Sequence, residues 1–169
     1  MSLPIADCTE TRIVDAVVKL FRDEDPDFSA LCQGRVKVGS AAVAPLDASI
    51  VPRQMNVYAG QAEKDPDVGD AWDLVCDVQI EYFFPRNLLS TEDGWRQSMN
   101  ECKAIVLKLY AGHHPRSPGR LNDPADTTKT ITNMIRSTRT SEPRLMESSI
   151  VRFITITFQT RETSAGEKV

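Results

Sequence analysis

The chain of 169 residues is long enough to bury one hydrophobic core, and its 41% hydrophobic and 26% charged residues are typical of an ordinary globular domain. No apolar run approaches the roughly 18 residues that a membrane-spanning helix needs, and the first residues lack the basic and apolar regions of a secretory signal. The four widely separated cysteines are therefore expected to be reduced residues of a cytoplasmic protein rather than a disulfide framework.

The formal net charge of −4 hides an uneven distribution of charge along the chain. Residues 1–101 hold 9 Lys or Arg against 18 Asp or Glu, whereas residues 102–161 hold 10 against 4. Such a split predicts faces of opposite sign, which can orient a partner or a second copy of the same protein. The alternative is chance segregation of charge on a solvated surface, where single exposed charges contribute little.

The first third of the chain predicts a single amphipathic helix. This helix is expected to begin after Asp7, with Glu10 as the second half of a capping box. Five apolar residues at helical spacing form its expected buried stripe: Ile13, Ala16, Val17, Leu20 and Phe21. The helix is expected to end in the acidic run 23–27, because Pro26 cannot continue it and carboxylates are unfavourable at a helix C-terminus.

Short strands separated by turns are expected to follow this helix. We expect strands at 35–38 and 54–58, with a loop at 41–52 between them that contains two prolines. Residues 61–70 are rich in Asp, Pro and Gly and are expected to form an acidic turn. This part of the chain therefore predicts two short strands of a sheet.

The strongest strand signal lies at 73–84, where apolar and polar side chains alternate. The side chains expected on the apolar face are Leu74, Cys76, Val78, Ile80 and Tyr82, and those on the polar face include Asp73, Asp77, Gln79 and Glu81. A strand with a period of two buries one face and exposes the other to solvent. The pattern therefore predicts a sheet that has helices on one side only.

A second amphipathic helix is expected at 91–110. Thr91 is among the residues that can cap its N-terminus, and Gly112 is a natural terminator. Apolar side chains at spacings of four and three residues form one stripe: Trp95, Met99, Cys102, Val106 and Leu109. Because this stripe matches the apolar face of the strand at 73–84, we expect the helix to pack on that face.

The last third of the chain predicts a long irregular connection and two strands. Gly and Pro residues at 112–126 indicate an irregular segment exposed to solvent. Strands are expected at 129–136 and at 150–161, where β-branched residues are frequent. The polar residues 162–169 are expected to form a frayed tail.

The order of these elements, α, β, β, β, α, β, β, predicts the fold class. The sequence has no internal repeat and no low-complexity tract. We therefore expect residues 1–169 to form a single α+β domain, with one mainly antiparallel sheet and two helices packed on it. Residues 112–145 are expected to extend from this body as a hairpin or loop arm.

No constellation of residues points to catalysis or to a metal. The adjacent His113 and His114 lack a further ligand at the spacing that zinc requires, so we expect a loop there rather than a zinc site. The chain has no Gly-x-Ser-x-Gly motif and no Gly-rich phosphate loop, and its acidic turn lacks the calcium-loop pattern. We therefore expect no enzymatic activity, no cofactor and no tightly bound metal.

A basic segment late in the chain is the best candidate for an interface that faces a partner or a lumen. Its cations are Arg116, Arg120, Lys129, Arg136, Arg139 and Arg144. Residues 111–152 hold no aromatic side chain, so the segment does not predict a stacking platform for single-stranded nucleic acid. The remaining interpretations are a contact with a nucleic-acid backbone, a charged protein interface or a solvated hairpin. Thr-rich strands favour the protein interface, because they can add to an exposed sheet edge.

The layout of these elements resembles that of the tail terminator, or tail completion, proteins of tailed bacteriophages and related phage-like particles. The resemblance covers nearly the whole chain and rests on the order and size of the elements. These are an N-terminal helix, a short strand ending near a glycine, a Pro-flanked strand at 51–58, the long alternating strand, a helix ending in Leu107-Lys108-Leu109, a Thr-rich segment and a closing strand at 153–161. The long loop at 112–127 departs from that layout.

The resemblance implies a structural virion protein that is assembled in the host cytoplasm and forms a hexameric ring at the head-proximal end of a phage tail. Such a ring stops polymerisation of the tail tube protein, joins the tail to a head-side connector or stopper protein, and can contact DNA non-specifically in its lumen. It implies no catalytic residue, no cofactor and no membrane. The alternatives are a head-completion or stopper protein of the neck and, from a different class, a small soluble enzyme.

Overall fold

The computed structural model describes residues 8–46, 53–66, 71–146 and 149–163. Its helical elements are α1 (Thr9–Lys19), the π-helical turn η1 (Leu20–Glu24), α2 (Pro26–Cys32), the 3-10 turn η2 (Arg86–Ser90) and α3 (Glu92–Ala111). Its strands are β1 (Val36–Val38), β2 (Gln54–Pro66), β3 (Ala71–Pro85), β4 (Met134–Thr140), β5 (Arg144–Met146) and β6 (Ser149–Thr163). The predicted α+β class is confirmed, and the short helix α2 is an addition to the two predicted helices. Within these residues no helix has the length and hydropathy needed to cross a bilayer.

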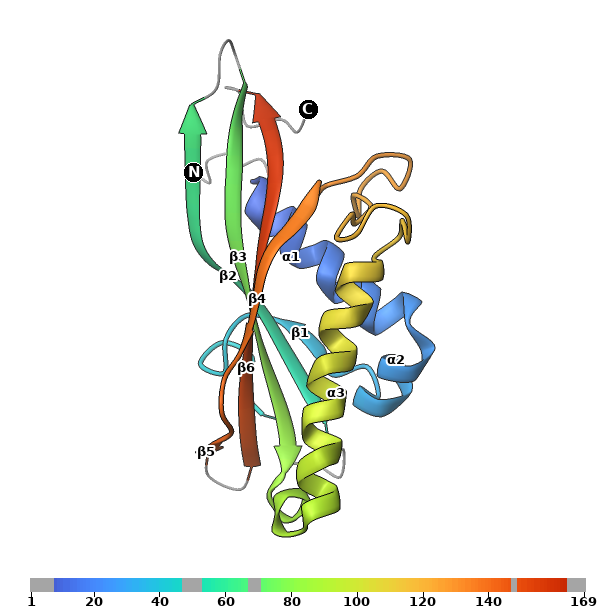
Figure 1. Cartoon of the computed structure of the whole chain (residues 1–169), viewed down its shortest axis with the longest axis vertical. Coiled ribbons are helices and arrows are strands. Elements are labelled where there is room, and N and C mark those ends of the chain that lie inside the picture. The colour runs from blue at the N-terminus through green and yellow to red at the C-terminus, as the bar shows by residue number, and fades with distance from the viewer. Residues whose placement is uncertain (1–7, 47–52, 67–70, 147–148, 164–169) are drawn as a thin grey trace, which may run out of the picture.

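The six strands form one sheet in the order β1-β2-β3-β6-β4, with β5 also paired to β6. Only the pair β1–β2 is parallel, and the other pairs are antiparallel. The helices lie on one side of this strongly twisted sheet, and α3 runs lengthwise beside it (Figure 1). β4 is the last strand on one edge, and no described strand pairs with its outer side.

The inner face of β3 forms the centre of the core, as its alternation predicts. Its apolar side chains are all fully buried: Leu74, Cys76, Val78, Ile80 and Tyr82. β6 supplies the neighbouring row of the core, with Phe158 opposite Cys76 and Ile156 opposite Val78. The prediction that helices cover only one face of this strand is therefore confirmed.

The helix α3 has nearly the predicted bounds, but its buried stripe is offset from the predicted one. Its buried residues are Gly94, Ser98, Cys102, Ile105 and Leu109. Trp95 and Met99, which were expected to be buried, are 42% and 52% exposed. The cause is the close approach of η2, because a Cβ on Gly94 would lie 1.6 Å from the carbonyl oxygen of Leu88. The first turns of α3 therefore place small residues inward and large residues outward.

The buried stripe predicted for the first helix is confirmed, but the helix ends differently. All five of its members are buried: Ile13, Ala16, Val17, Leu20 and Phe21. The N-cap position is Cys8, and the predicted cap Asp7 lies outside the described residues. The acidic run does not stop the helical path, because η1 continues to Glu24 and Pro26 then occupies the first turn of α2, where proline is well tolerated.

Asp25 connects α2 to α3 and provides a test of this arrangement. Its carboxylate accepts hydrogen bonds from the amides of Asp27 at 3.1 Å and Phe28 at 3.0 Å, and lies 2.6 Å from Lys108 Nζ. Burial alone would raise the pKa of Asp25, but these contacts hold that pKa below its ordinary value. We expect Asp25→Ala to lower the free energy of unfolding in urea by about 1–2 kcal/mol, and the exposed control Asp23→Ala to change it by less than about 0.5 kcal/mol. Equal effects of the two substitutions would contradict the capping role.

Several strand boundaries differ from the predicted ones. β2 continues to Pro66, so residues 61–66 of the predicted turn belong to a strand, which pairs with β3 across one bulge. Residues 67–70 of that turn lie outside the described residues. β4 replaces the strand predicted at 129–136 and begins later, since the residues before it form turns. The predicted frayed tail begins inside β6, which runs to Thr163, and residues 164–169 lie outside the described residues.

Residues 112–133 fold back on the body, so the prediction of an arm at 112–145 is wrong for its first part. Leu121 and Ile131 are fully buried, and the Ile131 amide donates to the Leu121 carbonyl oxygen at 2.7 Å. The Thr132 hydroxyl accepts a hydrogen bond from the Leu121 amide at 2.9 Å. Two apolar anchors and internal hydrogen bonds therefore hold a loop that lacks regular structure, and the remainder of the predicted arm forms β4 and β5 in the sheet.

Candidate interaction surface

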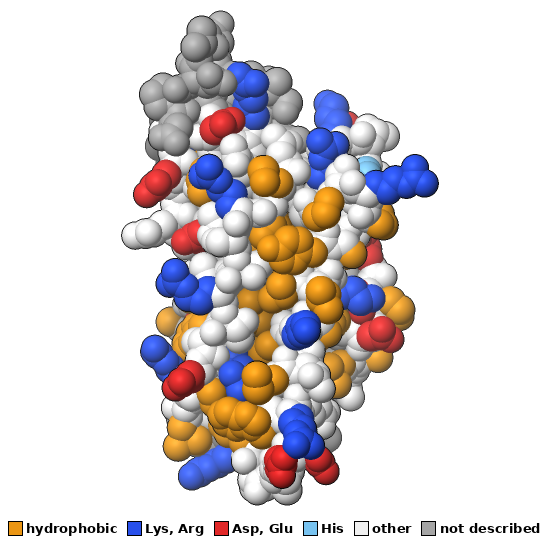
Figure 2. Space-filling model, viewed as in Figure 1, with side chains coloured by type: hydrophobic (Ala, Val, Ile, Leu, Met, Phe, Trp, Pro, Cys, Tyr) orange, Lys and Arg blue, Asp and Glu red, His pale blue; other side chains and the backbone are white. Residues whose placement is uncertain are grey.

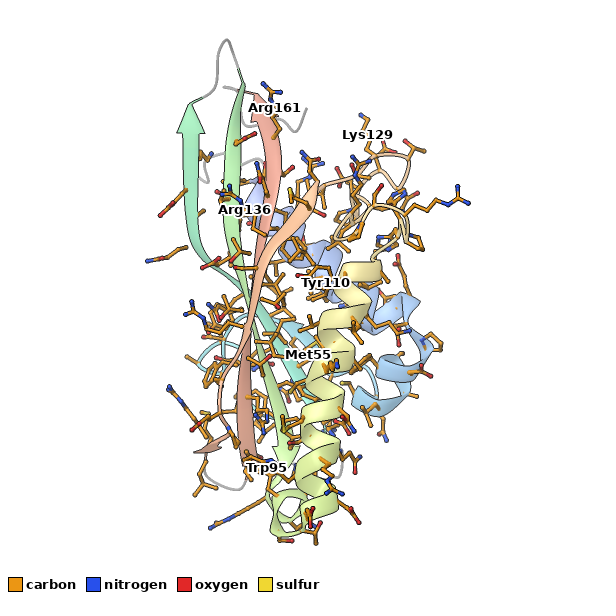
Figure 3. The ribbon with its side chains drawn as sticks, in the orientation of Figure 1. Met55, Trp95, Tyr110, Lys129, Arg136 and Arg161 are labelled. Carbon is orange, nitrogen blue, oxygen red and sulfur yellow. The ribbon has the colours of Figure 1, made fainter. Side chains whose placement is uncertain are left out.

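The basic residues predicted to form an interface are all exposed, and the structure distributes them along the molecule: Arg116, Arg120, Lys129, Arg136, Arg139 and Arg144. The first three lie in the loop 112–133, and Arg136 and Arg139 lie on the edge strand β4 (Figure 3). Arg144, on β5, stands over the ring of Phe153, with 5.5 Å between its Cζ and the ring centroid. These cations are therefore divided among the loop 112–133, β4 and β5.

A groove lies between α3 and the strands β4 and β6. It has a volume of about 580 Å³, and its lining includes Met99, Lys103, Val106, Thr138, Thr140 and Arg152. Figure 2 shows hydrophobic side chains gathered along the middle of the face on which α3 and β4 lie, with Lys and Arg side chains on both sides. The surface beside β4 therefore combines an apolar centre with margins that carry charges of both signs.

Arg152 is a buried cation that lines this groove. It is 5% exposed and lies opposite Tyr82 on the inner face of β6. Its Nη1 donates to the carbonyl oxygen of Ser141 at 3.1 Å, its Nη2 lies 3.5 Å from the Ser98 hydroxyl, and its Cζ lies 5.1 Å from the centroid of the Trp95 ring. Its Nε is buried and has no hydrogen-bond partner. None of the ion pairs between described residues includes this guanidinium.

Arg152 was not among the predicted site residues, although the sequence contains a signal for it. Position 152 has the same parity as Ile150, Ile154 and Ile156, which are all buried. In a strand of period two, an arginine at that parity must face the core. A buried cation of this kind needs a compensating partner, so the pattern marks the position as unusual.

A second buried arginine, Arg53, has the partner that Arg152 lacks. Its Nε and Nη2 donate to the two carboxylate oxygens of Glu101 at 2.8 and 3.0 Å, and the Tyr82 hydroxyl donates to the same carboxylate at 2.8 Å. Burial alone would raise the pKa of Glu101, but the hydrogen bonds from Arg53 and Tyr82 hold it below its ordinary value. Burial and the charge of Glu101 both raise the pKa of Tyr82, so its hydroxyl remains a donor. This network connects α3 to the sheet.

The outer face of the sheet carries cross-strand polar pairs. Three such pairs join β3 and β6: Gln79–Thr155 at 2.8 Å, Asp77–Thr157 at 2.6 Å and Asp73–Gln159 at 3.1 Å. At the other end of β3, Glu81 is 6% exposed and accepts a hydrogen bond from the Ala41 amide at 2.7 Å. The polar residues predicted for this face therefore stabilise the sheet through hydrogen bonds between strands.

The two histidines lie in the loop 112–133 and contact neighbouring parts of the subunit. His113 Nδ1 accepts a hydrogen bond from the Asn122 amide at 2.9 Å, and its Nε2 contacts the Glu24 carboxylate. Because Nδ1 is an acceptor, the proton lies on Nε2, which donates to Glu24. His114 Nε2 lies 2.9 Å from Asn122 Oδ1. Among the described residues, no group of three or more His, Cys, Asp or Glu side chains could hold a metal.

The cysteines are unpaired thiols, and three of them are buried. Burial raises the pKa of Cys32, Cys76 and Cys102 to about 12 in each case. These thiols therefore remain protonated near neutral pH and are poor nucleophiles. Cys102 also lines the groove, so the groove contains no thiolate that could act on a substrate.

No protein-family model matches this chain, and no curated protein matches its sequence. Its functional interpretation therefore depends on the fold and on the surface beside β4.

Proposed function

We propose that this chain is a structural virion protein of the tail terminator type, which forms a homo-oligomeric ring at the head-proximal end of a phage tail. The observation that carries the proposal is the sheet edge at β4, where no described strand pairs with the outer side and where a groove and exposed cations lie close by. Such an edge can accept a strand or a surface of another chain.

A second sheet edge supports the idea that the other chain is a copy of this one. β1 pairs only with residues 55–57 of β2, and the following residues 59–64 of β2 are exposed. β2 belongs to the acidic part of the sequence, whereas β4 belongs to the basic part. Two different edges, one of which carries the exposed cations Arg136 and Arg139, favour a heterologous contact, which closes into a ring when the rotation between copies is suitable.

In this proposal the ring ends the growth of the tail tube and offers its other side to a head-side connector or stopper protein. A hexamer is the expected stoichiometry, and the chain would be assembled in the host cytoplasm and remain in the virion neck. Arginines that face the lumen would contact DNA phosphates without reading the sequence. A head-completion or stopper protein would use the same surfaces, whereas the protonated thiols and the engaged histidines give a small-enzyme function less support.

Charge reversal on β4 tests the proposed contact. We expect the double substitution Arg136→Glu and Arg139→Glu to weaken ring formation by about tenfold or more at low salt, because it removes two attractive charges and adds repulsion. The effect should be smaller at high salt, where exposed charges are screened. Sedimentation velocity over a range of protein and salt concentrations measures the change.

A matched control reverses two exposed cations from the acidic part of the chain, Arg22→Glu and Arg86→Glu. This control changes the net charge by the same amount but leaves β4 intact, so it should assemble nearly as well as the parent. If both double variants form rings with parental affinity, the cations of β4 have no role in assembly.

A further inference from the structure

We propose that the Nε–Nη2 edge of Arg152 is a carboxylate-binding site that is completed by a second copy of this chain. The carboxylate is that of Glu63, which the exposed part of β2 in the second copy carries into the groove between α3 and β4. This inference rests on the proposed ring and names the contact that joins one copy to the next.

A comparison of the two buried arginines shows that Arg152 lacks the carboxylate partner that Arg53 has. Arg53 and Arg152 are each 5% exposed, and each lies near an aromatic ring, Phe84 at 5.5 Å and Trp95 at 5.1 Å. In Arg53 the Nε–Nη2 edge holds the Glu101 carboxylate in a two-point hydrogen bond. In Arg152 the same edge has an unpartnered Nε and a single long contact at Nη2. A planar guanidinium binds a carboxylate best through such a fork.

The guanidinium of Arg152 also forms no ion pair with a described carboxylate of its own subunit. The Ser141 carbonyl oxygen and the Trp95 ring hold the guanidinium in position, but neither carries a negative charge. A buried charge without a counter-charge, together with an unsatisfied donor, is unfavourable for the isolated subunit. An incoming carboxylate would remove both costs at once, so association with an acidic partner is favoured at this point.

The groove offers an incoming side chain both a charge and an apolar wall. Lys103 lines the groove near Arg152, and Met99 contributes to the wall at 52% exposure. Trp95 lies at the N-terminal end of α3 (Figure 3) and covers one face of the guanidinium. Glu142 also lines the groove and repels a second carboxylate, but the two cations outnumber it. The groove therefore favours an acidic side chain carried by a slender segment.

The exposed part of β2 has these properties. Residues 59–64 read Ala-Gly-Gln-Ala-Glu-Lys, so half of them are small, and Glu63 is exposed beside Lys64. This stretch lies beyond the residues that β1 covers, at a sheet edge. It therefore presents a carboxylate on a thin strand and comes from the part of the chain with excess negative charge.

Zero-length carbodiimide cross-linking tests this contact, because Lys103 supplies an amine inside the groove. Equal amounts of unlabelled and ¹⁵N-labelled protein are mixed, cross-linked and digested, and mass spectrometry then separates intermolecular from intramolecular products. We expect an intermolecular amide between Lys103 and Glu63. Glu63→Gln lacks the carboxylate that the carbodiimide activates, so only Arg152→Met tests the yield of this product, which it should reduce. Both substitutions should weaken association by about tenfold or more, as the loss of a charge-assisted pair predicts.

Two further variants distinguish the two-point hydrogen bond of the guanidinium from a simple attraction between opposite charges. Arg152→Lys keeps the positive charge but loses the fork, so it should restore little of the lost association. Glu142→Gln removes the repelling carboxylate and should strengthen association. Thermal melting of each variant at a concentration where copies are separate checks the fold. If Arg152→Met does not fold, Glu63→Gln tests the same contact from the other side and leaves the core unchanged.

The outcomes distinguish this inference from the proposed ring. If rings form, neither Arg152→Met nor Glu63→Gln weakens them, and Arg152→Met leaves the Lys103 products unchanged, the inference is wrong and the ring stands. If the parent stays monomeric and Lys103 links only to Glu142 of its own copy, both are wrong. A Lys103–Glu63 link in a two-copy assembly would support the inference and contradict the ring.

Discussion

Replacing Arg53 with methionine is expected to lower the free energy of unfolding by about 3–5 kcal/mol, the usual cost of leaving one member of a buried ion pair without its partner. Arg53 is 5% exposed and makes a two-point hydrogen bond to Glu101, which also accepts from Tyr82. The substitution removes the cation but leaves the carboxylate between α3 and the sheet. Urea denaturation at neutral pH and low protein concentration measures the loss.

Two controls show whether the loss of unfolding free energy comes from the Glu101 carboxylate that is left without its partner. The double substitution Arg53→Met and Glu101→Leu removes both charges and should recover most of the stability. Arg152→Met removes a cation with equal burial but leaves no paired carboxylate behind, so it should cost much less. Equal losses for Arg53→Met and Arg152→Met would contradict the different roles assigned to these two arginines.

The Arg53–Glu101 ion pair also predicts how the stability of the folded chain changes with pH. The pKa of Glu101 is lower in the folded than in the unfolded chain, so the unfolded state binds the proton more readily. The contribution of Glu101 to stability is therefore present above the ordinary glutamate pKa of about 4.3 and is lost as the pH falls through its lower folded value. In Arg53→Met this contribution should disappear, and burial should instead raise the pKa of Glu101.

Replacing Ile105 with alanine is the second substitution with a large expected effect, about 2–5 kcal/mol of unfolding free energy. Ile105 is fully buried on the face of α3 that packs on the sheet. Truncation removes apolar contacts and leaves a cavity that the rigid sheet cannot fill. The loss should appear as a lower urea midpoint with an unchanged slope.

Two exposed residues of the same helix serve as controls for Ile105. Met99 and Leu107 are 52% and 57% exposed, and alanine has good helix propensity, so each replacement by alanine should change the unfolding free energy by less than about 0.5 kcal/mol. A large loss for Met99→Ala with a small loss for Ile105→Ala would instead support the stripe predicted from the sequence spacing.

The sequence predicts most reliably the elements that have strong local periodicity. The alternation of β3 determines its buried face, because every apolar residue at one parity lies in the core. The capping Thr91 and the terminating Gly112 bracket α3 correctly. The buried face of α3 is not predictable in the same way, since its rotation depends on the approach of Leu88 to Gly94 across η2.

The loop 112–133 and the edge strand that follows it depend on contacts that are distant in sequence. Gly and Pro residues correctly predict an absence of regular structure there, but they do not reveal that Leu121 and Ile131 attach the loop to the core. Similarly, the sequence predicts that the helix ends in the acidic run, but η1 continues to Glu24 and Asp25 begins α2, because its carboxylate caps the next amides.

The candidate surface is predictable in part. Composition identifies the exposed cations, because most Arg and Lys residues lie on the surface. The position of Arg152 in its strand predicts that its charge is buried. The sequence does not predict which guanidinium nitrogens lack a partner, because that depends on the positions of Ser98, Ser141 and Trp95 around them.

Native mass spectrometry of the purified chain tests the proposed ring most directly. The account predicts a dominant species with six times the subunit mass of 18.8 kDa, which dissociates as the salt concentration is raised. A monomer at every concentration, or an open series of masses without a closed species, would contradict the account.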